Sequence, residues 1–321
     1  MTSTPSTAAA PHIVALGEPM IEFNQTRAGS ADALLRGVGG DTSNMAIAAA
    51  RLGRGLPEPL RVAYVTRVGD DAFGRLLLAL WREEGVDTSG VAIDATAPTG
   101  VYFVSHGPQG HEFSYLRAGS AASRMRPEGL PADLLRAARL LHVSGISEAI
   151  SASACDTVLA AIELARAAGA KVSFDPNLRL KLWPLSRARA IITHTIAQCD
   201  IFLPSLDEIR QLSGYTDVDA LIDWSHARGA PLVILKCGPD GVWVSDGTRR
   251  AQIAPHQVDT KDATGAGDCF DGAFCVRTLA GDAPVDAARY ANAAAALATT
   301  GYGAVAPLPT DAAVRALLDS R

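Results

Sequence analysis

The stretch of this sequence that could most directly do chemistry is KDATGAGD, at residues 261–268. Its two glycines, Gly265 and Gly267, allow the backbone to turn tightly and to approach a ligand closely. The small and apolar residues that follow, as far as Ala280, predict a helix that begins at about Ala266. The free N–H groups and the positive dipole end of this helix would face the turn, which therefore predicts an anion site.

Asp268 falls in the first turn of that helix, beside the predicted anion site. A carboxylate in this position can accept a proton from a hydroxyl group that is about to attack phosphorus. For a lone GxG pattern, a loop followed by a helix-capping acid would be the better interpretation. The longer string DATGAGD resembles a signature of the PfkB family of sugar and nucleoside kinases, and this resemblance favours the catalytic interpretation, in which Asp268 takes the proton of the attacking hydroxyl.

The composition is that of an ordinary globular protein with a mild negative charge. The chain has 321 residues, of which 48% are hydrophobic and 20% charged, and its net charge of −5 argues against a nucleic-acid partner. The five cysteines show no CxxC spacing, which suits reduced thiols in a cytoplasmic protein. Residues 1–11 predict a disordered tail rather than a signal peptide. No apolar run approaches the ~18 residues of a membrane span, so we expect no membrane partner.

Strand-like and helix-like segments alternate through most of residues 12–321, which predicts one α/β domain with a mostly parallel central sheet and helices on both faces. The predicted strands are 12–17, 61–68, 140–144, 171–175, 200–203, 232–236 and 241–245. The predicted helices are 45–52, 71–84, 151–168, 187–195, 206–212, 266–279, 285–299 and 311–319.

Residues 19–38 and 90–118 interrupt this alternation and predict a small antiparallel lid. Short strand-like runs at 91–94, 100–106 and 111–117 are separated by proline and glycine. Tyr115 and Arg117 would share one face of the lid, and Tyr102 on the neighbouring strand could join them. This arrangement suits closure over a polar, anionic substrate, although an exposed cross-strand pair is the simpler alternative.

Ligands of an open α/β sheet bind at the carboxyl ends of its strands, where this sequence places several polar residues. Gly40 lies at a strand-to-helix turn, and Asp41 is a plausible N-cap of the helix that follows. Asn44, on the first turn of that helix, could form a hydrogen bond with a sugar hydroxyl. Arg179 follows a strand and is a candidate for binding phosphate or carboxylate, with a surface salt bridge as the alternative.

Two further segments suit a nucleotide and its metal ion. Lys236 ends a strand, and Gly238 and Gly241 would let a nucleotide lie against the backbone, although a hairpin turn also explains them. Glu208 opens a helix, where it could hold water on Mg²⁺ or simply favour the helix dipole. The sequence has no Walker A string, no GxGxxG after its first strand and no GxSxG elbow. These absences argue against a P-loop NTPase, a dinucleotide-binding dehydrogenase and a hydrolase with a Ser/His/Asp triad.

Gly39-Gly40 with Asn44, and the string from Asp262 to Asp268, resemble the two signatures of the PfkB, or ribokinase-like, family of sugar and nucleoside kinases. The resemblance runs from His12 to near Pro309 and implies a ribokinase-like fold. Within the family, the strings GEPMIE, GGDT, YLR, LHVSGI and FDPNLR look most like those of 2-keto-3-deoxygluconate kinases. We therefore expect an ATP-dependent kinase that phosphorylates the terminal hydroxyl of this sugar acid. The alternatives are a fructokinase, a ribokinase, a nucleoside kinase or a non-catalytic sugar-binding protein.

The resemblance also implies roles for individual residues. Asp268 would be the catalytic base, and the N–H groups of Gly265, Ala266 and Gly267 would form the anion hole, also in contact with the nucleotide. The substrate side would comprise Gly40, Asn44, Tyr102, Tyr115, Arg117 and Arg179, and the nucleotide side Ser205, Lys236, Gly238, Gly241 and Asn292. The implied cofactors are ATP, Mg²⁺ held by Glu208 through water, and a monovalent cation near Asp262 and Thr264. The implied assembly is a homodimer formed through the lid.

Overall fold

The structure, a computed structural model, describes residues 10, 12–25, 33–107 and 110–320. Apart from Ala10, the expected disordered tail at residues 1–11 lies outside the described residues, as does the part of the expected lid at 26–32. Among the helices that are described, none combines the length and the apolar character needed to cross a membrane. The cytoplasmic location stays a prediction.

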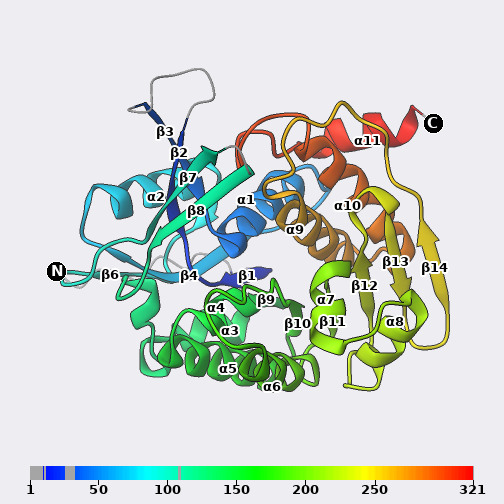
Figure 1. Ribbon diagram of the computed structural model, residues 1–321, viewed down its shortest axis with the longest axis horizontal. Helices are drawn as coiled ribbons and strands as arrows, with labels where there is room; N and C mark the ends of the chain where they lie inside the picture. Colours follow the sequence, from blue (N-terminus) through cyan, green and yellow to red (C-terminus); the bar gives the residue numbers. More distant parts are fainter. Residues whose placement is uncertain (1–9, 11, 26–32, 108–109, 321) are drawn as a thin grey trace.

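A large sheet forms the middle layer of the molecule (Figure 1). Its strands are β1 (Ile13–Leu16), β4 (Val62–Gly69), β5 (Val86–Asp87), β6 (Val91–Asp94), β9 (Leu140–Ser144), β10 (Lys171–Asp175), β11 (Ile201–Phe202), β12 (Val233–Lys236), β13 (Val242–Ser245) and β14 (Arg250–Ile253). Their order is β14-β13-β12-β11-β10-β9-β1-β4-β5, and β6 also pairs with β4. All pairs from β12 to β5 are parallel, and among the described strands of this large sheet only β13 and β14 add antiparallel pairs. The predicted mostly parallel sheet is confirmed.

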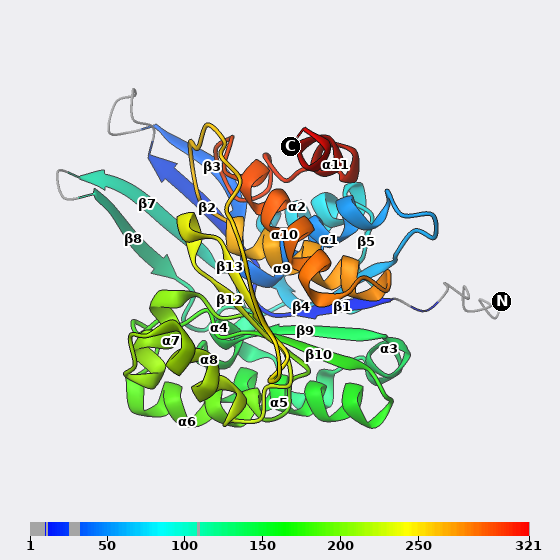
Figure 2. The same ribbon diagram turned by 90° about the vertical axis from the view of Figure 1, so that its right-hand side faces the viewer.

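Helices cover both faces of this sheet (Figure 2). One face carries α1 (Asp41–Gly53), α2 (Ala72–Glu83), α9 (Ala266–Leu279), α10 (Pro284–Ala298) and α11 (Asp311–Asp319). The other carries α3 (Ala132–Ala137), α4 (Gly145–Ala149), α5 (Ala152–Ala167), α6 (Leu185–Ile196), α7 (Leu206–Ser213) and α8 (Val218–His226). Short 3-10 turns lie at η1 (Ala122–Arg124), η2 (Pro127–Gly129) and η3 (Gly238–Asp240).

Strand β1 shows why a continuous apolar run forms a central strand. Ile13 and Ala15 pack into the core on the α1 and α9 side, whereas Val14 and Leu16 pack into the core on the α5 and α6 side. Successive side chains of a strand point to opposite faces, so a strand covered by helices on both faces needs apolar residues at every position.

A second, smaller sheet stands beside the large one and consists of β2 (Met20–Gln25), β3 (Leu34–Gly39), β7 (Val101–Gly107) and β8 (Gly110–Leu116). Its order is β3-β2-β7-β8, and the two outer pairs are antiparallel while β2 and β7 are parallel. The segment 91–94, which the sequence placed with the lid, is instead β6 and pairs with residues 66–69 of β4. The small sheet is therefore built from β2, β3, β7 and β8, without residues 91–94.

Helices α1 and α9 approach each other closely at a glycine. A Cβ atom on Gly272 would lie 2.7 Å from the carbonyl oxygen of Met45 and 3.0 Å from the Cβ of Ala48. Since real Cβ atoms do not come so near a backbone oxygen, only glycine allows this separation of the two helices. The contact brings the amino-terminal ends of α1 and α9 together beside the small sheet.

We expect Gly272→Ala to lower the free energy of unfolding by about 1–3 kcal/mol, because overpacking a dense core costs this much. Urea denaturation measures the change. Gly129→Ala is a matched control, since a Cβ atom there would meet nothing within 4 Å. The control should remain within ~0.5 kcal/mol of the parent chain. Equal stability of the Gly272→Ala variant and the parent would show that α1 and α9 tolerate a wider separation.

Candidate active site

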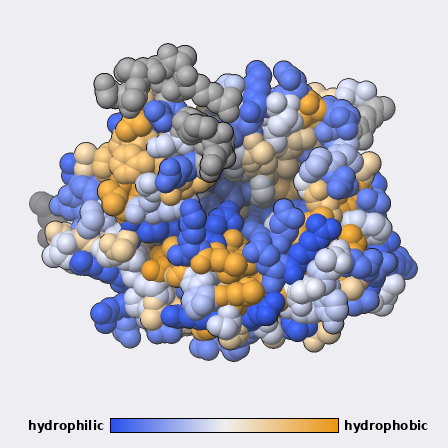
Figure 3. Space-filling view, in the orientation of Figure 1, coloured by the Kyte–Doolittle hydropathy of each residue, from blue (hydrophilic) through white to orange (hydrophobic). Residues whose placement is uncertain are grey.

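A cavity of about 1140 Å³ lies between the small sheet and the carboxyl ends of the parallel strands. Figure 3 shows it as a hollow near the centre of the face seen in Figure 1. Residues at or just after the ends of β9, β10, β11 and β12 contribute Ile146, Asp175, Ser205 and Lys236 to its lining. Open α/β sheets bind their ligands at this edge, because loops from neighbouring parallel strands converge there.

The structure brings every site residue predicted from the sequence to this one cavity. Its lining includes Gly40, Asn44, Tyr102, Tyr115, Arg117, Arg179, Ser205, Glu208, Lys236, Gly238, Gly241, Gly265, Ala266, Gly267, Asp268 and Asn292. Their contacts decide what each side chain is free to do, and the roles implied by the resemblance stay predictions.

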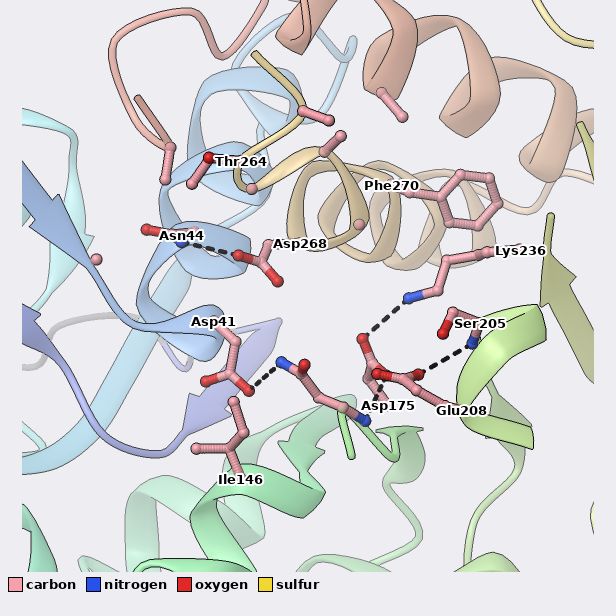
Figure 4. Close-up of a pocket in the computed structure, with 18 of the residues that line it drawn as sticks. Asp41, Asn44, Ile146, Asp175, Ser205, Glu208, Lys236, Thr264, Asp268 and Phe270 are labelled. Atoms are coloured by element: carbon pink, nitrogen blue, oxygen red, sulfur yellow. Dashed lines mark hydrogen bonds and ion pairs between the residues drawn. The ribbon is translucent and has the colours of Figure 1, made fainter. Parts of the chain in front are cut away.

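Asp268 and Asn44 meet where α9 and α1 begin (Figure 4). The Nδ2 atom of Asn44 donates a hydrogen bond to Oδ2 of Asp268 at 2.8 Å. The Oδ1 atom of Asn44 is buried and has no partner within the described part of the chain. A buried polar atom without a partner is costly, so this oxygen is suited to accept a hydrogen bond from a ligand hydroxyl.

The surroundings of Asp268 adjust its acidity. Burial raises the pKa of Asp268 to about 7, the nearby carboxyl of Asp41 adds to this rise, and the hydrogen bond from Asn44 acts against it. Burial likewise raises the pKa of Asp41. A carboxyl group that titrates near neutral pH is well matched to taking up and releasing a proton, as a general base must.

The amino terminus of α9 is left open toward the cavity. Gly265 precedes the helix with a φ of 75°, in the left-handed region, and no side chain caps this end. A Cβ atom on Gly265 would also lie 2.9 Å from the Cβ of Ala304, so glycine is needed for both reasons. The N–H of Ala266 donates to the carbonyl oxygen of Ala263 at 3.2 Å and is therefore engaged in a turn. An anion here would depend mainly on the neighbouring N–H groups, among them that of Gly267.

Lys236 lies directly beneath this helix end. Its Nζ atom donates to Oδ2 of Asp175 and to Oδ1 of Asp271, both at 2.9 Å, and a Cβ atom on Gly267 would be 3.8 Å from it. Burial opposes the charge on Lys236, but the two carboxylates outweigh burial and raise its pKa. The sequence analysis missed Asp271 as a site residue. Its signal was the spacing of three from Asp268, which puts both acids on one helix face.

Glu208 and Ser205 form a capping box at the start of α7. The N–H of Ser205 donates to Oε2 of Glu208 at 3.2 Å, and the N–H of Leu178 donates to Oε1 at 3.0 Å. Arg179 also reaches Oε1, at 3.4 Å. Among the described residues, no cluster of three or more His, Cys, Asp or Glu could chelate a metal ion. The described residues thus offer no metal site built from protein ligands alone, and the expected contact of Glu208 with Mg²⁺ through water stays a prediction.

The lid-side residues form a stacked group at the other end of the cavity. The rings of Tyr102 and Tyr115 stack with centroids 5.8 Å apart, and the guanidinium of Arg117 lies 5.6 Å from the Tyr115 centroid. The Tyr102 hydroxyl donates to Glu22 at 2.5 Å. Arg117 donates to Glu18, with which it forms an ion pair. Arg117 is thus not the free cation that the sequence analysis expected.

Asp41 is a cavity residue that the sequence analysis treated only as a possible helix cap. The N-cap of α1 is instead Gly40, with a φ of 110°. Oδ2 of Asp41 accepts a hydrogen bond of 2.8 Å from Nδ2 of Asn177. Asn177 has a φ of 31°, in the left-handed region, which is uncommon for a residue other than glycine and often marks a functional site. An acid directly after paired glycines at a strand end was the available signal.

The predicted nucleotide side is shaped mainly by backbone. Gly241 follows η3 with a φ of 86°, and a Cβ atom there would lie 2.0 Å from the carbonyl oxygen of Ile253. The hairpin between β12 and β13 therefore requires this glycine, as the simpler interpretation held. A Cβ atom on Gly238 would meet nothing within 4 Å, so the space above it is open. Nδ2 of Asn292 donates to the carbonyl oxygen of Ala254 at 2.9 Å.

Comparison with known proteins finds similar chains of nearly the same length. Probable fructokinase-4 of Arabidopsis thaliana is 35% identical over 323 residues, with 95% of this chain and 96% of the relative covered. Fructokinase from Xylella fastidiosa, solved with bound ATP, is 27% identical with a TM-score of 0.86, covering 96% of this chain and 98% of that one. A fructokinase double mutant from Vibrio cholerae, solved with fructose, ADP and potassium, is 27% identical with a TM-score of 0.85, covering 96% and 99%.

The expectation of a 2-keto-3-deoxygluconate kinase is wrong, because the similar curated proteins are named fructokinases. The structure gives a physical reason for the error. The sequence analysis based this expectation on resembling strings such as GGDT and LHVSGI, and it took Arg117 and Arg179 as side chains that could bind an acidic sugar. Both arginines contact a carboxylate within the protein, Glu18 for the first and Glu208 for the second.

The fold and a match over nearly the whole chain point to one family. Solved structures with this arrangement of a mainly parallel sheet, flanking helices and a small second sheet are ribokinase-like. The family model described as pfkB family carbohydrate kinase matches residues 10–311. This chain therefore belongs to the pfkB family of carbohydrate kinases.

Proposed function

We propose that this protein is an ATP-dependent fructokinase, in which Asp268 takes the proton from the sugar hydroxyl that attacks the γ-phosphate. The observation that carries the proposal is the pairing of Asp268 with Asn44 at the start of α9, inside the cavity. The similarity to proteins named fructokinases supports the choice of sugar.

The charges in the cavity favour a neutral sugar over a sugar acid. Arg117 pairs with Glu18, and Arg179 contacts Glu208 at 3.4 Å. Lys236 is held between acids in the same way. The carboxyl groups of Asp41 and Asp268 also line the cavity. A substrate carboxylate would meet like charges, which are unfavourable when partly desolvated, whereas sugar hydroxyls can donate to these oxygens.

The residues around Asp268 divide the work of phosphoryl transfer. Asn44 holds the carboxylate of Asp268 in place through its 2.8 Å hydrogen bond. The open end of α9 supplies positive potential where negative charge develops. ATP with Mg²⁺ would supply the phosphoryl group and neutralise part of its charge. The open space above Gly238 and the part of the cavity lined by Glu208 are where we place the nucleotide and its metal ion.

A monovalent cation and a homodimer stay predictions. Oδ1 of Asp262 accepts hydrogen bonds from Thr264, and Oδ2 accepts one from Gly303, so these two loops are tied together where the cation was expected. On the edge strands β3 and β8 of the small sheet, Leu35 and Leu116 are 65% and 67% exposed. These are the apolar side chains that a dimer formed through this sheet would cover.

A substrate panel tests the proposed function directly. We expect a kcat/KM for ADP release at least tenfold higher for D-fructose than for 2-keto-3-deoxygluconate, since the paired charges of the cavity suit a neutral sugar better than a sugar acid. It should also be higher for D-fructose than for D-ribose or adenosine, in line with the similarity to proteins named fructokinases. A higher kcat/KM for ribose or adenosine would move the assignment to another member of the family. ADP release with none of these compounds would favour a sugar-binding protein that lacks the chemistry.

Asp268→Asn should reduce kcat for fructose by roughly 10²–10⁴-fold, because the amide cannot accept the hydroxyl proton. Calorimetric binding of fructose should remain, as asparagine keeps the size of the side chain. Asp286→Asn is the control, since Asp286 occupies the first turn of the neighbouring helix α10, and it should retain full activity. An unchanged kcat in Asp268→Asn would remove Asp268 from the role of base.

The pH profile should report the acidity of Asp268. Protonated Asp268 cannot accept a proton, so kcat/KM for fructose should rise with pH through a midpoint near the pKa of about 7. Because the charge of Asp41 raises this pKa, Asp41→Asn should move the midpoint to lower pH. Steady-state rates from pH 5 to pH 9 measure it, with Asp286→Asn as the control. A midpoint that Asp41→Asn leaves in place would show that Asp41 does not influence the base.

A further inference from the structure

Most of the positive charge that lines the cavity is already paired with negative charge. Among the described residues, the carboxyl groups of the lining belong to Glu18, Asp41, Asp175, Glu208 and Asp268, and its arginine and lysine side chains are Arg117, Arg179, Lys181 and Lys236. Every one of these cations except Lys181 contacts a carboxylate of the protein. A nucleotide triphosphate carries several negative charges, so it needs positive charge that the protein has not neutralised.

Lys181 is the cation that remains available. Its side chain is exposed, and its ammonium forms no ion pair or hydrogen bond with the part of the chain that the structure describes. A lysine ammonium is a compact charge on a flexible stem, with three donors that suit phosphate oxygens. Lys181 can therefore exchange water for phosphate without breaking a contact within the protein. Lys236, by contrast, would have to leave the carboxylates of Asp175 and Asp271.

The backbone fixes the place of Lys181 in the cavity wall. The N–H of Leu182 donates to the carbonyl oxygen of Arg179 at 2.9 Å, which closes a turn that contains Lys181. Leu178 and Trp183 flank this turn, and both are buried in the core on the α5 and α6 side. The turn is thus anchored at both ends, whereas the side chain of Lys181 stays free to move.

This turn borders the part of the cavity in which we place the nucleotide and its metal ion. The N–H of Leu178 donates to Oε1 of Glu208 at 3.0 Å, and Arg179 reaches the same oxygen at 3.4 Å. Figure 4 shows Glu208 beside Asp175 and Lys236, below the start of α9. Lys181 is therefore carried by the same short segment that contacts Glu208.

We propose that Lys181 is a phosphate-binding residue, whose ammonium contacts the phosphate groups of the nucleotide. This inference rests on the proposed function as an ATP-dependent kinase. The open end of α9 offers N–H groups to the same phosphates, and Lys181 adds the full positive charge that the paired cations of the cavity do not. The simpler alternative is a solvated lysine that borders the cavity and contacts no ligand.

Chemical labelling of lysines tests this contact whichever sugar is the substrate. The sequence has four lysines, and Lys171 and Lys181 are both exposed. The non-hydrolysable analogue AMP-PNP with Mg²⁺ should slow the acetylation of Lys181 by acetic anhydride severalfold, as followed by mass spectrometry. Lys171 is the internal control, because it begins β10 at the opposite edge of the sheet and does not line the cavity. Equal labelling of Lys181 with and without the nucleotide would overturn the proposal, as would protection by D-fructose alone.

Lys181→Met measures how much the contact contributes to nucleotide binding. The calorimetric Kd for AMP-PNP with Mg²⁺ should rise roughly tenfold, as expected for the loss of one hydrogen bond between charged groups. The KM for ATP should rise in parallel, while the KM for D-fructose should stay within about twofold. Lys181→Arg keeps the charge and should retain most of the affinity. Lys171→Met is the matched control and should bind the nucleotide like the parent.

The outcomes separate this inference from the proposed function. Because Lys181 is exposed, its replacement should leave the melting temperature of the protein unchanged, so a weaker Kd would not reflect misfolding. A Kd that Lys181→Met leaves unchanged would refute the role of Lys181, even in an active kinase. A parent protein that binds AMP-PNP but releases no ADP with any sugar would refute the kinase function instead.

Discussion

The close approach of α9 to α1 is the constraint on which the site depends. Gly272 lets the two backbones come together, and their amino-terminal ends then meet beside the cavity. The hydrogen bond between Asn44 and Asp268, which joins residues 224 positions apart, follows from this contact. The helix packing therefore sets the orientation of the Asp268 carboxylate, the proposed base, as well as contributing to stability. Asp271, one turn further along α9, pairs with Lys236 of β12.

Charge pairing is the second feature that links structure to function. Arg117 from the lid, Arg179 from the loop after β10 and Lys236 at the end of β12 each contact a carboxylate. The positive charge of these three side chains is thereby largely cancelled. The atoms that can still accept a hydrogen bond from a ligand hydroxyl are oxygens, such as the buried Oδ1 of Asn44. The part of the cavity around Asn44 is therefore better matched to hydroxyls than to a sugar carboxylate.

Local patterns in the sequence were sufficient for the fold. Continuous apolar runs such as 13–16 predict strands that are buried on both faces, and glycine turns with apolar periodicity predict the helices between them. Residues 91–94 show the limit of such patterns, because the sequence assigned them to the lid whereas the structure places them in the large sheet. This segment looks like the lid strands that follow it, and only its pairing with β4 assigns it to a sheet. Strand partners depend on long-range packing, which a local pattern does not contain.

The sequence by itself determined that Asp268 stands in a glycine turn at a helix start, and that Gly40, Asn44 and Lys236 fall near strand or helix ends. Such features depend on a few neighbouring residues. Only the tertiary structure decided which charges are free. The partner of Arg117 is Glu18, 99 residues away, and that of Lys236 is Asp175, 61 residues away. Ion pairing depends on distance in space, and the fold alone sets the distance between residues so far apart in the chain.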